Sequence, residues 1–432
     1  MHGEGPDGGE DGAGLRWLFL DLNAYFASVE QQMNPDWRGK PVIVRPAPSE
    51  HTGAIAASYE SKAFGVRTGM RVSEARALCP GLIVADARPD LYVKIHHRIM
   101  AVLDRHVAIF KVGSIDEASC RLTRGQQRVD QAVPLAQAIQ TAIRKEVGDC
   151  LHSSVGLAPS RFLAKTACGM QKPDGLTVLR ADALPGPLLN LPLSKYPGVG
   201  PRMVKRLAAA GITDTAGLWA LDARRARAVW GSVEGERIWR GLHGLDSDIP
   251  PPKPIASISH SHVLASAMRT PEGARAVARR LIVKCGARLR RLGLTGGALG
   301  LHIDLGEGRR RGGWSNAGLY LAVPPTSDTF VLLAALETLW RRAAPAPGAR
   351  PAHVGVSIHA LKPIGETLPD LFDPGPDQGG ASRSLRLSQA LDTLNRRYGK
   401  DTVSIGPRPD LPAYVGAKIA FNRIPELEEF WE

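Results

Sequence analysis

Three carboxylates in two short segments are the residues of this chain best suited to chemistry. Asp21 follows an apolar run, Trp17 to Leu20, whose length and composition predict a buried strand. Asp116 and Glu117 are adjacent, at the point where Lys111 to Leu122 predicts two short strands joined by a turn. A charged side chain at the end of a buried strand is costly unless it is paired or binds a metal ion.

Carboxylates in this arrangement suit a pair of divalent cations. Neighbouring residues on a strand point to opposite faces, but at a hairpin or a bulge both can converge on one site. Magnesium prefers oxygen ligands and takes others from substrate phosphates, and two such ions roughly 3.5–4 Å apart hold the reacting oxygens in phosphoryl transfer. For Asp21 alone, a cap on the helix predicted from Ala24 onward is an equally good interpretation.

Seven motifs in one order resemble those of the Y-family translesion DNA polymerases. The carboxylates lie in Asp21-Leu-Asn-Ala-Tyr-Phe26 and Ser114-Ile-Asp-Glu-Ala118. The other matches are Tyr59-Glu-Ser-Lys-Ala-Phe-Gly-Val66, Ser154-Val-Gly-Leu-Ala-Pro-Ser160, Phe162-Leu-Ala-Lys165, Lys172-Pro-Asp-Gly175 and Pro197-Gly-Val-Gly200. Each motif is weak alone, whereas this many in one order are specific. The core is similar to DinB, or polymerase IV, and the tail around Leu391-Asp-Thr-Leu-Asn-Arg-Arg-Tyr398 is similar to UmuC-type members.

The resemblance implies a role for each of several residues. Asp21, Asp116 and Glu117 would be the catalytic residues and would hold two Mg²⁺ ions, with the Leu22 carbonyl as a further ligand. The residues implied to contact the incoming nucleotide are Tyr25, Phe26, Tyr59, Lys62 and Lys172. Lys62 stands where the family usually has arginine, so it keeps the charge but loses the bidentate phosphate geometry. Lys165 is expected to be structural or exposed.

Two of these aromatic residues have a purely structural alternative. By resemblance Phe26 is the steric gate that excludes a ribose 2′-hydroxyl, with Tyr25 as the second candidate. Its spacing to Val29 and Met33 equally predicts the first core residue of a helix. Tyr59 contacts the triphosphate by resemblance, and a half-buried aromatic that anchors its helix is the alternative.

The order of elements and the resemblance predict an α+β multidomain protein of the right-hand polymerase type. It would have an antiparallel palm sheet, small fingers, a helical thumb with a helix-hairpin-helix, and a β-α-β-β-α-β little finger. The expected bounds are a disordered leader at 1–14, palm at 15–23 and 87–178, fingers at 24–86, thumb at 179–247, a proline-rich linker at 248–258, little finger at 259–362, and a partly disordered tail at 363–432.

Two regions are expected to bind DNA. Gly198 and Gly200 flank one apolar residue before a helix predicted at 203–210, with a second helix from Gly211 to Leu218, and such a hairpin presents backbone N–H groups to a phosphate. Residues 259–362 carry 15 Lys/Arg and 5 Asp/Glu, which is +10 of the whole-chain +13. The residues implied to contact DNA are Gly198, Gly200, Arg275, Arg279 and Arg280.

Composition limits the class of protein. Hydrophobic residues make up 44%, no apolar run approaches a membrane span, and the first 14 residues contain no apolar segment. The five cysteines form no Cys-x-x-Cys pair, so neither a disulfide framework nor a zinc site is favoured. The net charge of +13 suits a polyanionic partner. We expect a cytoplasmic protein that is a monomer and has no membrane partner.

A short apolar segment in the polar tail resembles the sliding-clamp-binding motif of bacterial polymerases. It reads Leu368-Pro-Asp-Leu-Phe-Asp373, with Leu371 and Phe372 as the contact residues. Leu368 stands where the leading glutamine of that motif is expected. The replication sliding clamp is therefore a partner that the resemblance implies.

The most specific interpretation is a template-directed DNA polymerase that carries out low-fidelity translesion synthesis by two-metal nucleotidyl transfer, in DNA repair and damage tolerance. Its partners would be primer–template DNA and deoxynucleoside triphosphates. One alternative is a non-catalytic DNA- and clamp-binding adaptor of the same family. A second alternative is a nucleotidyl cyclase, which shares a palm-like sheet and paired carboxylates. The predicted helix-hairpin-helix and the basic C-terminal domain count against it.

Overall fold

The chain folds into two compact units. The computed structural model describes residues 14–46, 48–246, 255–305, 318–343, 345–366, 380–399, 402–405 and 424. The first unit runs up to residue 249 and the second begins at residue 250. Each unit has its own sheet and its own hydrophobic core, so each is described by itself.

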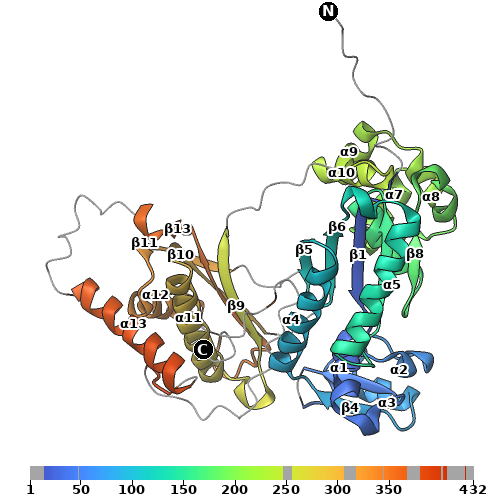
Figure 1. The fold of residues 1–432 in the computed structure, drawn as a ribbon. Coiled ribbons are helices and arrows are strands. Elements are labelled where there is room, and N and C mark those ends of the chain that lie inside the picture. Colours follow the sequence, from blue (N-terminus) through green and yellow to red (C-terminus); the bar gives the residue numbers. More distant parts are fainter. Residues whose placement is uncertain are drawn as a thin grey trace, which may run out of the picture. The chain divides into compact units, whose positions relative to one another are not determined.

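The first unit is built on a five-stranded sheet with the order β5-β6-β1-β7-β8 (Figure 1). Its strands are β1 (Trp17–Leu22), β5 (Ile109–Ser114), β6 (Glu117–Arg121), β7 (Ser153–Ala158) and β8 (Leu176–Val178). The strands β5, β6, β1 and β7 are antiparallel, as expected, but β8 pairs with β7 in parallel. The reason is that a helix separates β7 from β8, and a strand–helix–strand connection returns the chain in the same direction.

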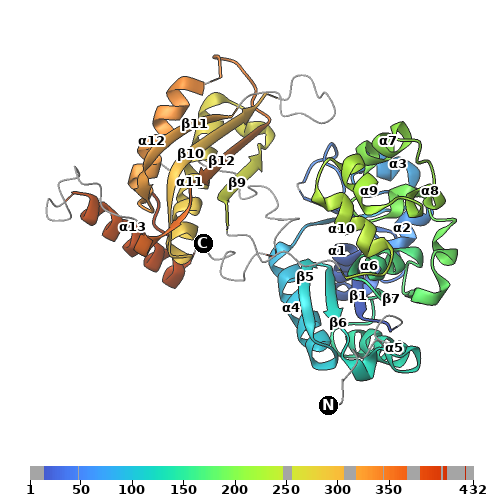
Figure 2. The ribbon, with the colours of Figure 1, turned by 90° about the horizontal axis from the view of Figure 1, so that it is seen from above.

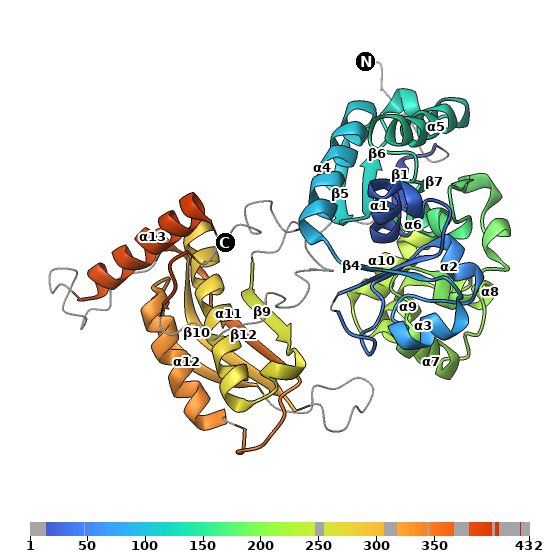
Figure 3. The ribbon, with the colours of Figure 1, turned by 90° about the horizontal axis from the view of Figure 1, so that it is seen from below.

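The central strand β1 is apolar on both faces because two different cores cover it. Leu18, Leu20 and Leu22 belong to a core shared with helices α1, α4 and α5, whereas Trp17 and Phe19 belong to a core shared with α6 and residues 179–242. This alternation is the period of two that a strand imposes. Figure 3 shows α4 beside α5, and α5 also packs on β7 and β8. The helices are α1 (Tyr25–Met33), α4 (Pro89–His106), α5 (Val129–Glu146) and α6 (Arg161–Met170).

A small second sheet, β3-β2-β4, lies within the region expected to be fingers. Its elements are β2 (Val42–Arg45), β3 (Ala56–Ala57), α2 (Tyr59–Ala63), α3 (Val72–Leu78) and β4 (Ile83–Asp86). The strand β3 is only two residues long, and Gly53 before it forms an isolated bridge with Arg71. Helix α1, also expected in the fingers, shares its core with β1 and α4.

Four helices follow in residues 179–246: α7 (Pro201–Ala209), α8 (Thr215–Trp219), α9 (Ala223–Trp230) and α10 (Val233–Leu242). The second helix of the predicted hairpin starts later than expected, at Thr215 rather than Gly211. Gly211 has a positive φ of 79° and ends the preceding turn, and the Asp214 side chain caps α8 by accepting from the Gly217 N–H.

The second unit has the predicted β-α-β-β-α-β order (Figure 2). Its elements are β9 (Ser257–Val263), α11 (Pro271–Arg291), β10 (Leu294–Asp304), β11 (Leu319–Thr326), α12 (Thr329–Ala343), β12 (His353–His359) and the short β13 (Lys362–Pro363). The sheet order is β11-β10-β12-β9, and α11 and α12 pack on the sheet. A further helix, α13 (Gly380–Tyr398), packs on α11 and α12. Part of the expected tail is therefore an ordered layer of this unit.

Short 3₁₀ turns complete the description: Pro35–Trp37, Arg124–Gln126, Ala181–Ala183, Gly186–Leu188, Leu193–Lys195, Ser266–Met268 and Ile364–Glu366. The expected leader up to residue 13, most of the expected linker (248–254) and the segment Leu368–Asp373 lie outside the described residues. Among the helices of the described ranges, none is both long enough and apolar enough to cross a bilayer.

Candidate active site

The three carboxylates lie at one end of the main sheet because β1 and β6 pair there. Asp21 on β1 is opposite Glu117 on β6, and the Leu22 N–H donates to the Asp116 carbonyl over 2.7 Å. Asp116 lies in the tight turn between β5 and β6. The two motifs, almost a hundred residues apart in the sequence, are thus joined by backbone hydrogen bonds. Asp21 does not cap α1, which begins after Ala24 with no side-chain cap among the described residues; the capping interpretation is wrong.

Two lysines pair with two of these carboxylates. The Lys172 Nζ donates to Asp21 Oδ1, and the Lys165 Nζ donates to both carboxylate oxygens of Glu117 at 2.8 Å each. Lys165 was expected to be structural or exposed; its side chain is 41% exposed, and it pairs with Glu117 beside the other carboxylates. The signal that sequence reasoning missed is the placement of Lys165 on α6, which packs on β7, with Lys172 in the turn that directly follows the same helix.

Helix α6 brings Lys165, and the turn after it brings Lys172, close to the carboxylates because the helix lies very near the sheet. A Cβ atom added at Gly156 on β7 would lie 2.0 Å from the Ala164 carbonyl oxygen and 2.4 Å from the Cys168 nitrogen. Only glycine leaves room for this approach of helix backbone to strand. Ser160 caps the helix by accepting from the Leu163 N–H over 3.1 Å.

The loop that carries Lys172 is held by a buried polar network. The Asn23 Oδ1 accepts from the Asp174 N–H over 2.7 Å, and its Nδ2 donates to the Ser154 Oγ over 3.1 Å. The same Ser154 Oγ accepts from the Gly175 N–H over 3.3 Å. Asn23 and Ser154 are almost fully buried, so these bonds keep the loop beside the end of β1.

The electrostatics of the site are those of crowded like charges. Burial raises the pKa of Asp21, Lys172 opposes that rise, and Asp116 and Glu117 add to it. For Lys172, burial favours the neutral form, but the attraction of Asp21 outweighs it and the pKa of Lys172 is raised. A cation near these carboxylates is therefore favoured, and in the chain alone lysine ammonium groups take that place.

The carboxylates fit divalent cations by donor type, although they do not form a closed cage. Within the described ranges, no group of three or more His, Cys, Asp or Glu side chains is gathered tightly enough to hold a metal ion alone. Asp21, Asp116 and Glu117 supply hard oxygen donors, which suit Mg²⁺. An open set of this kind suits a cation that takes its remaining ligands from a phosphate substrate.

The aromatic residues after Asp21 pack on Tyr92 of α4. The Phe26 ring is 8% exposed and stacks on Tyr92, with ring centroids 4.5 Å apart and planes at 22°. Tyr25 is 3% exposed, and its hydroxyl donates to the Tyr92 carbonyl over 2.7 Å. Burial also raises the pKa of Tyr25. Tyr25 is therefore fixed in the core, while Phe26 retains a small exposed edge.

An ion pair with a buried carboxylate holds Tyr92 in place. Glu30 is 2% exposed, accepts from the Tyr92 hydroxyl over 2.8 Å, and forms two hydrogen bonds with the Arg88 guanidinium. A bidentate guanidinium partner satisfies both carboxylate oxygens, which is what a buried carboxylate requires. Sequence reasoning missed Glu30, Arg88 and Tyr92, because the pairing joins residues about sixty positions apart.

Tyr59 and Lys62, the two predicted nucleotide contacts on α2, lie near the charges of Lys172 and Asp21. The Lys62 Nζ lies 4.0 Å from the centre of the Tyr59 ring. Burial lowers the pKa of Lys62, Lys172 lowers it further, and Asp21 opposes the shift. Burial also raises the pKa of Tyr59, which Lys172 opposes. Both side chains thus lie within electrostatic reach of Lys172 and Asp21.

The two glycines of the expected DNA hairpin differ in backbone conformation, so only one of the positions favours glycine for that reason. Gly198 has a positive φ of 79°, which favours glycine. Gly200, the N-cap of α7, has an ordinary φ of −82°, and a Cβ added there would meet nothing within 4 Å. Local structure therefore does not require glycine at position 200, which leaves a close approach by a ligand as a reason.

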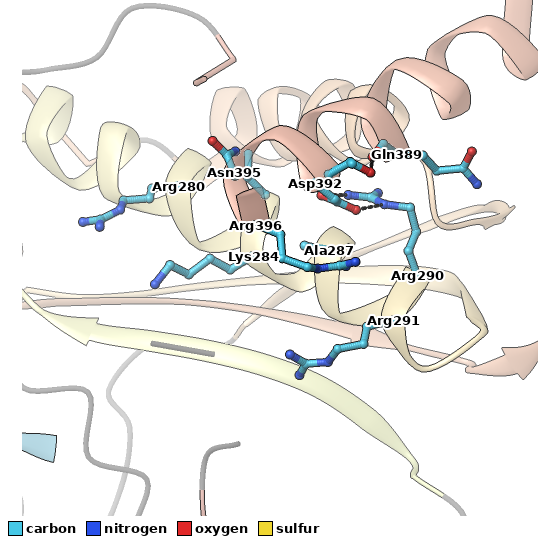
Figure 4. A pocket seen from close by; sticks show the side chains of 11 residues that line it. Arg280, Lys284, Ala287, Arg290, Arg291, Gln389, Asp392, Asn395 and Arg396 are labelled. Atoms are coloured by element: carbon cyan, nitrogen blue, oxygen red, sulfur yellow. Dashed lines mark hydrogen bonds and ion pairs between the residues drawn. The ribbon is translucent and has the colours of Figure 1, made fainter. Parts of the chain in front are cut away.

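The basic residues of α11 have different surroundings. Arg275 and Arg279 both donate to Glu337 on α12, so these guanidinium groups join the two helices. Arg280 lines a hollow between α11 and α13 (Figure 4). The predicted DNA contacts on α11 thus lie on two sides of the helix. Arg275 and Arg279 face Glu337 on α12, whereas Arg280 faces the hollow toward α13.

Comparison with known proteins places this geometry among polymerases. Residues 20–169 match the impB/mucB/samB family, and residues 255–371 match the C-terminal domain of that family. The chain is 34% identical to DNA polymerase IV of Moorella thermoacetica, over 89% of this chain and 94% of that protein, and 33% identical to DNA polymerase IV of Pelotomaculum thermopropionicum, over 89% and 93%. The solved Y-family DNA polymerase chimera Dbh-Dpo4(243-245)-Dbh is similar in fold, with a TM-score of 0.66 and 22% identity over 80% of this chain and 99% of that one. The α+β multidomain fold expected from the sequence is confirmed.

Proposed function

Because this chain belongs to the impB/mucB/samB family, as a DinB-like member of the Y-family polymerases, we propose that Asp21, Asp116 and Glu117 form the centre of its DNA polymerase site. The protein is a DNA-directed DNA polymerase of the translesion type. The observation that supports the site is the strand pairing that sets Asp21 on β1 opposite Glu117 on β6. Beside them, the Leu22 N–H donates a backbone hydrogen bond to the Asp116 carbonyl.

The three carboxylates and the Leu22 carbonyl would hold divalent cations, and Mg²⁺ in two copies fits their hard oxygen donors. When bound there, such ions supply the charge that activates the primer 3′-hydroxyl and stabilises the pyrophosphate leaving group. In the chain alone, Lys165 pairs with Glu117 and Lys172 pairs with Asp21. Lys172, on a loop held by Asn23, is placed to exchange Asp21 for a nucleotide phosphate.

Residues of α1 and α2 would orient the nucleotide. Tyr59 and Lys62 lie within electrostatic reach of Lys172, so the three are suited to one triphosphate. Phe26, with Tyr92 stacked behind it, is placed to form a rigid wall beneath the sugar. Tyr25 is the weaker candidate for that wall, because its ring is buried and its hydroxyl is bonded to the Tyr92 carbonyl.

The subdivision into palm, fingers, thumb and little finger is part of this proposal. The main sheet would be the palm, the small sheet the fingers, helices α7 to α10 the thumb, and the second unit up to β13 the little finger. Gly198 and Gly200 before α7 would contact the DNA backbone. The DNA polymerase IV relatives support primer–template DNA and deoxynucleoside triphosphates as partners. A monomeric, cytoplasmic protein remains our expectation.

The experiment that tests the site is primer extension by Asp116→Ala and Glu117→Ala variants. We expect incorporation to fall by roughly a hundredfold or more, because charge stabilisation in the transition state is lost, while gel-shift affinity for primer–template stays within about twofold. Asp182→Ala, which removes an exposed carboxylate paired with Arg180, is the control and should retain full activity. Activity that survives both site substitutions would contradict the assignment of the site, whereas a wild type that extends no primer would support the non-catalytic adaptor, for which the comparisons offer no support.

Clamp binding by Leu371 and Phe372 is a separate proposal about a segment outside the described residues. It rests on an apolar pair in a polar stretch, with Leu368 in place of glutamine. We expect Phe372→Ala to weaken binding to the bacterial replication clamp about tenfold in a solution assay, by loss of a buried aromatic anchor. Pro369→Ala, two residues before the pair, is the control. An unchanged clamp affinity for Phe372→Ala would reject the proposal.

A further inference from the structure

The turn that carries Asp116 is held from two directions. It consists of Ile115 and Asp116, between β5 and β6. On one side, the Leu22 N–H at the end of β1 donates to the Asp116 carbonyl over 2.7 Å. On the other side, the Nδ1 of His96 on α4 lies 2.8 Å from the Ile115 carbonyl oxygen. Because a carbonyl oxygen can only accept, His96 donates this hydrogen bond, and the turn is bonded to two different elements.

The hairpin needs such support because its own pairing is irregular beside the turn. Ser114 pairs with Glu117, but the register of β5 against β6 shifts between Val112 and Ser114. An irregularity of this kind interrupts the hydrogen-bond ladder and bends the strand. The pairing of β5 with β6 therefore constrains the turn only weakly, and hydrogen bonds from neighbouring elements supply the further constraint.

The Asp116 side chain is oriented from within the same hairpin. The Ser114 Oγ donates to Asp116 Oδ1 over 2.5 Å. Since donor and acceptor both belong to the hairpin, this bond fixes the carboxylate relative to the turn but not relative to Asp21 on β1. A displaced turn would carry the Asp116 carboxylate with it and leave Asp21 in place.

His96 is suited to hold the turn by its burial and its charge state. It is 2% exposed, and burial lowers the pKa of its imidazole to about 4. The ring is therefore neutral at physiological pH and carries one N–H, which bonds to the Ile115 carbonyl. Breaking this bond inside the protein would leave a donor and an acceptor unpaired, which costs free energy.

Helix α4 is a firm base for the bond. Ile99 and Leu103 of this helix are fully buried in the core that also contains β1. Tyr92, four residues before His96 and so on the same side of α4, stacks on Phe26. One side of α4 thus contacts both the aromatic pair expected beneath the sugar and the turn that carries a carboxylate.

We propose that His96 is a positioning residue of the polymerase site, which holds the Ile115 carbonyl and thereby sets where the Asp116 carboxylate lies relative to Asp21. The inference rests on the proposed role of these carboxylates as ligands of divalent cations. His96 acts only through the turn. Residues that orient metal ligands in this way typically change metal affinity or activity by about 10–100-fold when they are replaced.

The test compares three substitutions in the full chain. His96→Leu keeps a side chain of similar size and removes the donor. His96→Asn keeps an N–H close to the position of Nδ1. His106→Leu is the matched control, because the Nδ1 of His106 also bonds to a backbone carbonyl, that of Val102 at 2.9 Å. His106 is ten residues further along α4, about 15 Å at 1.5 Å per residue.

Two quantities are measured besides stability and gel-shift affinity for primer–template. The first is kcat for primer extension at saturating nucleotide. The second needs no catalysis: it is the affinity for Mn²⁺, which accepts the same oxygen ligands, of the complex with a dideoxy-terminated primer and the next nucleotide. Electron paramagnetic resonance of free Mn²⁺ gives this affinity. Circular dichroism melts establish that each variant is folded at the assay temperature.

We expect His96→Leu to lower both kcat and Mn²⁺ affinity by about tenfold or more, with gel-shift affinity for primer–template unchanged. His96→Asn should recover most of both losses, because the donor to Ile115 is restored. His106→Leu should match the wild type in both quantities. If His96→Leu is unfolded, His96→Phe, which keeps a flat ring without a donor, takes its place.

A donor-free variant at position 96 whose kcat and Mn²⁺ affinity equal those of His106→Leu would overturn the inference. An asparagine variant as defective as the donor-free one would assign the effect to side-chain shape and overturn it too. Either result, with Asp116→Ala inactive, would leave the proposed function standing. A wild type that shows no metal-dependent extension would instead contradict the proposed function itself.

Discussion

At the scale of single residues, the site is organised by pairs of opposite charge. Glu117 is paired with Lys165, Asp21 with Lys172, and the buried Glu30 with Arg88. A buried or half-buried carboxylate without a partner would lose several kcal/mol of hydration free energy. In the proposed mechanism, substrate and cations replace the lysines of the first two pairs, whereas the third pair keeps Tyr92 fixed.

Phe26 is the residue for which the structural and functional interpretations diverge most. Its ring stacks on Tyr92 and is 8% exposed, so both a core role and a gate role have a physical basis. We expect Phe26→Ala to reduce the preference for deoxynucleotides over ribonucleotides by at least about tenfold, because the clash with the 2′-hydroxyl is removed. The measurement is the ratio of kcat/KM for a deoxynucleotide and the matching ribonucleotide.

Loss of the Phe26 ring will also lower the free energy of unfolding, by up to about 3–5 kcal/mol for an aromatic core residue. Val29→Ala, fully buried on the same helix, is the control because it destabilises α1 without facing a nucleotide. That variant should keep the wild-type ratio. If Phe26→Ala also keeps it, the residue is a core residue only.

At the scale of elements, α11 is held on two sides by different ion pairs. Toward α12, Arg275 and Arg279 share Glu337, and toward α13, Arg290 binds Asp392. A helix with many arginines would repel itself unless neighbouring elements supplied carboxylates. These pairs account for how so basic a helix packs between two others.

The Glu337 pair predicts a pH dependence of stability. Burial raises the pKa of Glu337, but the hydrogen bonds from Arg275 and Arg279 outweigh burial and hold that pKa below its ordinary value. A lowered pKa in the folded state stabilises the fold above the unfolded-state value, and the gain is lost as pH falls through the folded-state value. We expect Glu337→Gln to be less stable than the wild type above about pH 5, with the difference shrinking below about pH 4.

Urea unfolding of both proteins at several pH values measures this difference. Glu272→Gln is the control, since Glu272 lies in the first turn of the same helix. At neutral pH, Glu272→Gln should change the free energy of unfolding by less than Glu337→Gln does. A Glu337→Gln deficit that is constant from acidic to neutral pH would show that the pair does not depend on the charge of Glu337.

At the scale of the whole molecule, the chain consists of two units with separate cores. The core around β1 and the core around α11 and α12 share no described residue. Independent cores are expected to unfold independently. We therefore expect scanning calorimetry of the full chain to show two transitions rather than one.

Core substitutions identify which transition belongs to which unit. Leu336→Ala, in the core of the second unit, should lower only one melting temperature, by about 4–15 °C for a loss of 2–5 kcal/mol. Leu18→Ala, in the core of the first unit, should lower only the other. If either substitution lowers both temperatures equally, the two units unfold as one.

The sequence by itself determined the features that depend on local pattern. The strand that ends at Asp21, the Asp116–Glu117 hairpin, and the helices at 89–106 and 271–291 were all predictable from periodicity, within a few residues. The order of motifs identified the family, which the comparisons confirm. These features are set by neighbours in the chain, so one sequence contains the information for them.

The tertiary structure alone decided which side chains meet. Lys165 reaches Glu117 across 48 residues, Arg290 reaches Asp392 across 102, and Arg275 is engaged by Glu337 across 62. The spacing of charges along a helix shows which side they share but not which partner faces that side. The partner depends on how the helices pack on the sheet. For α6, Gly156 decides this by allowing the helix to approach β7 closely. Such packing is a property of the whole core rather than of any local segment.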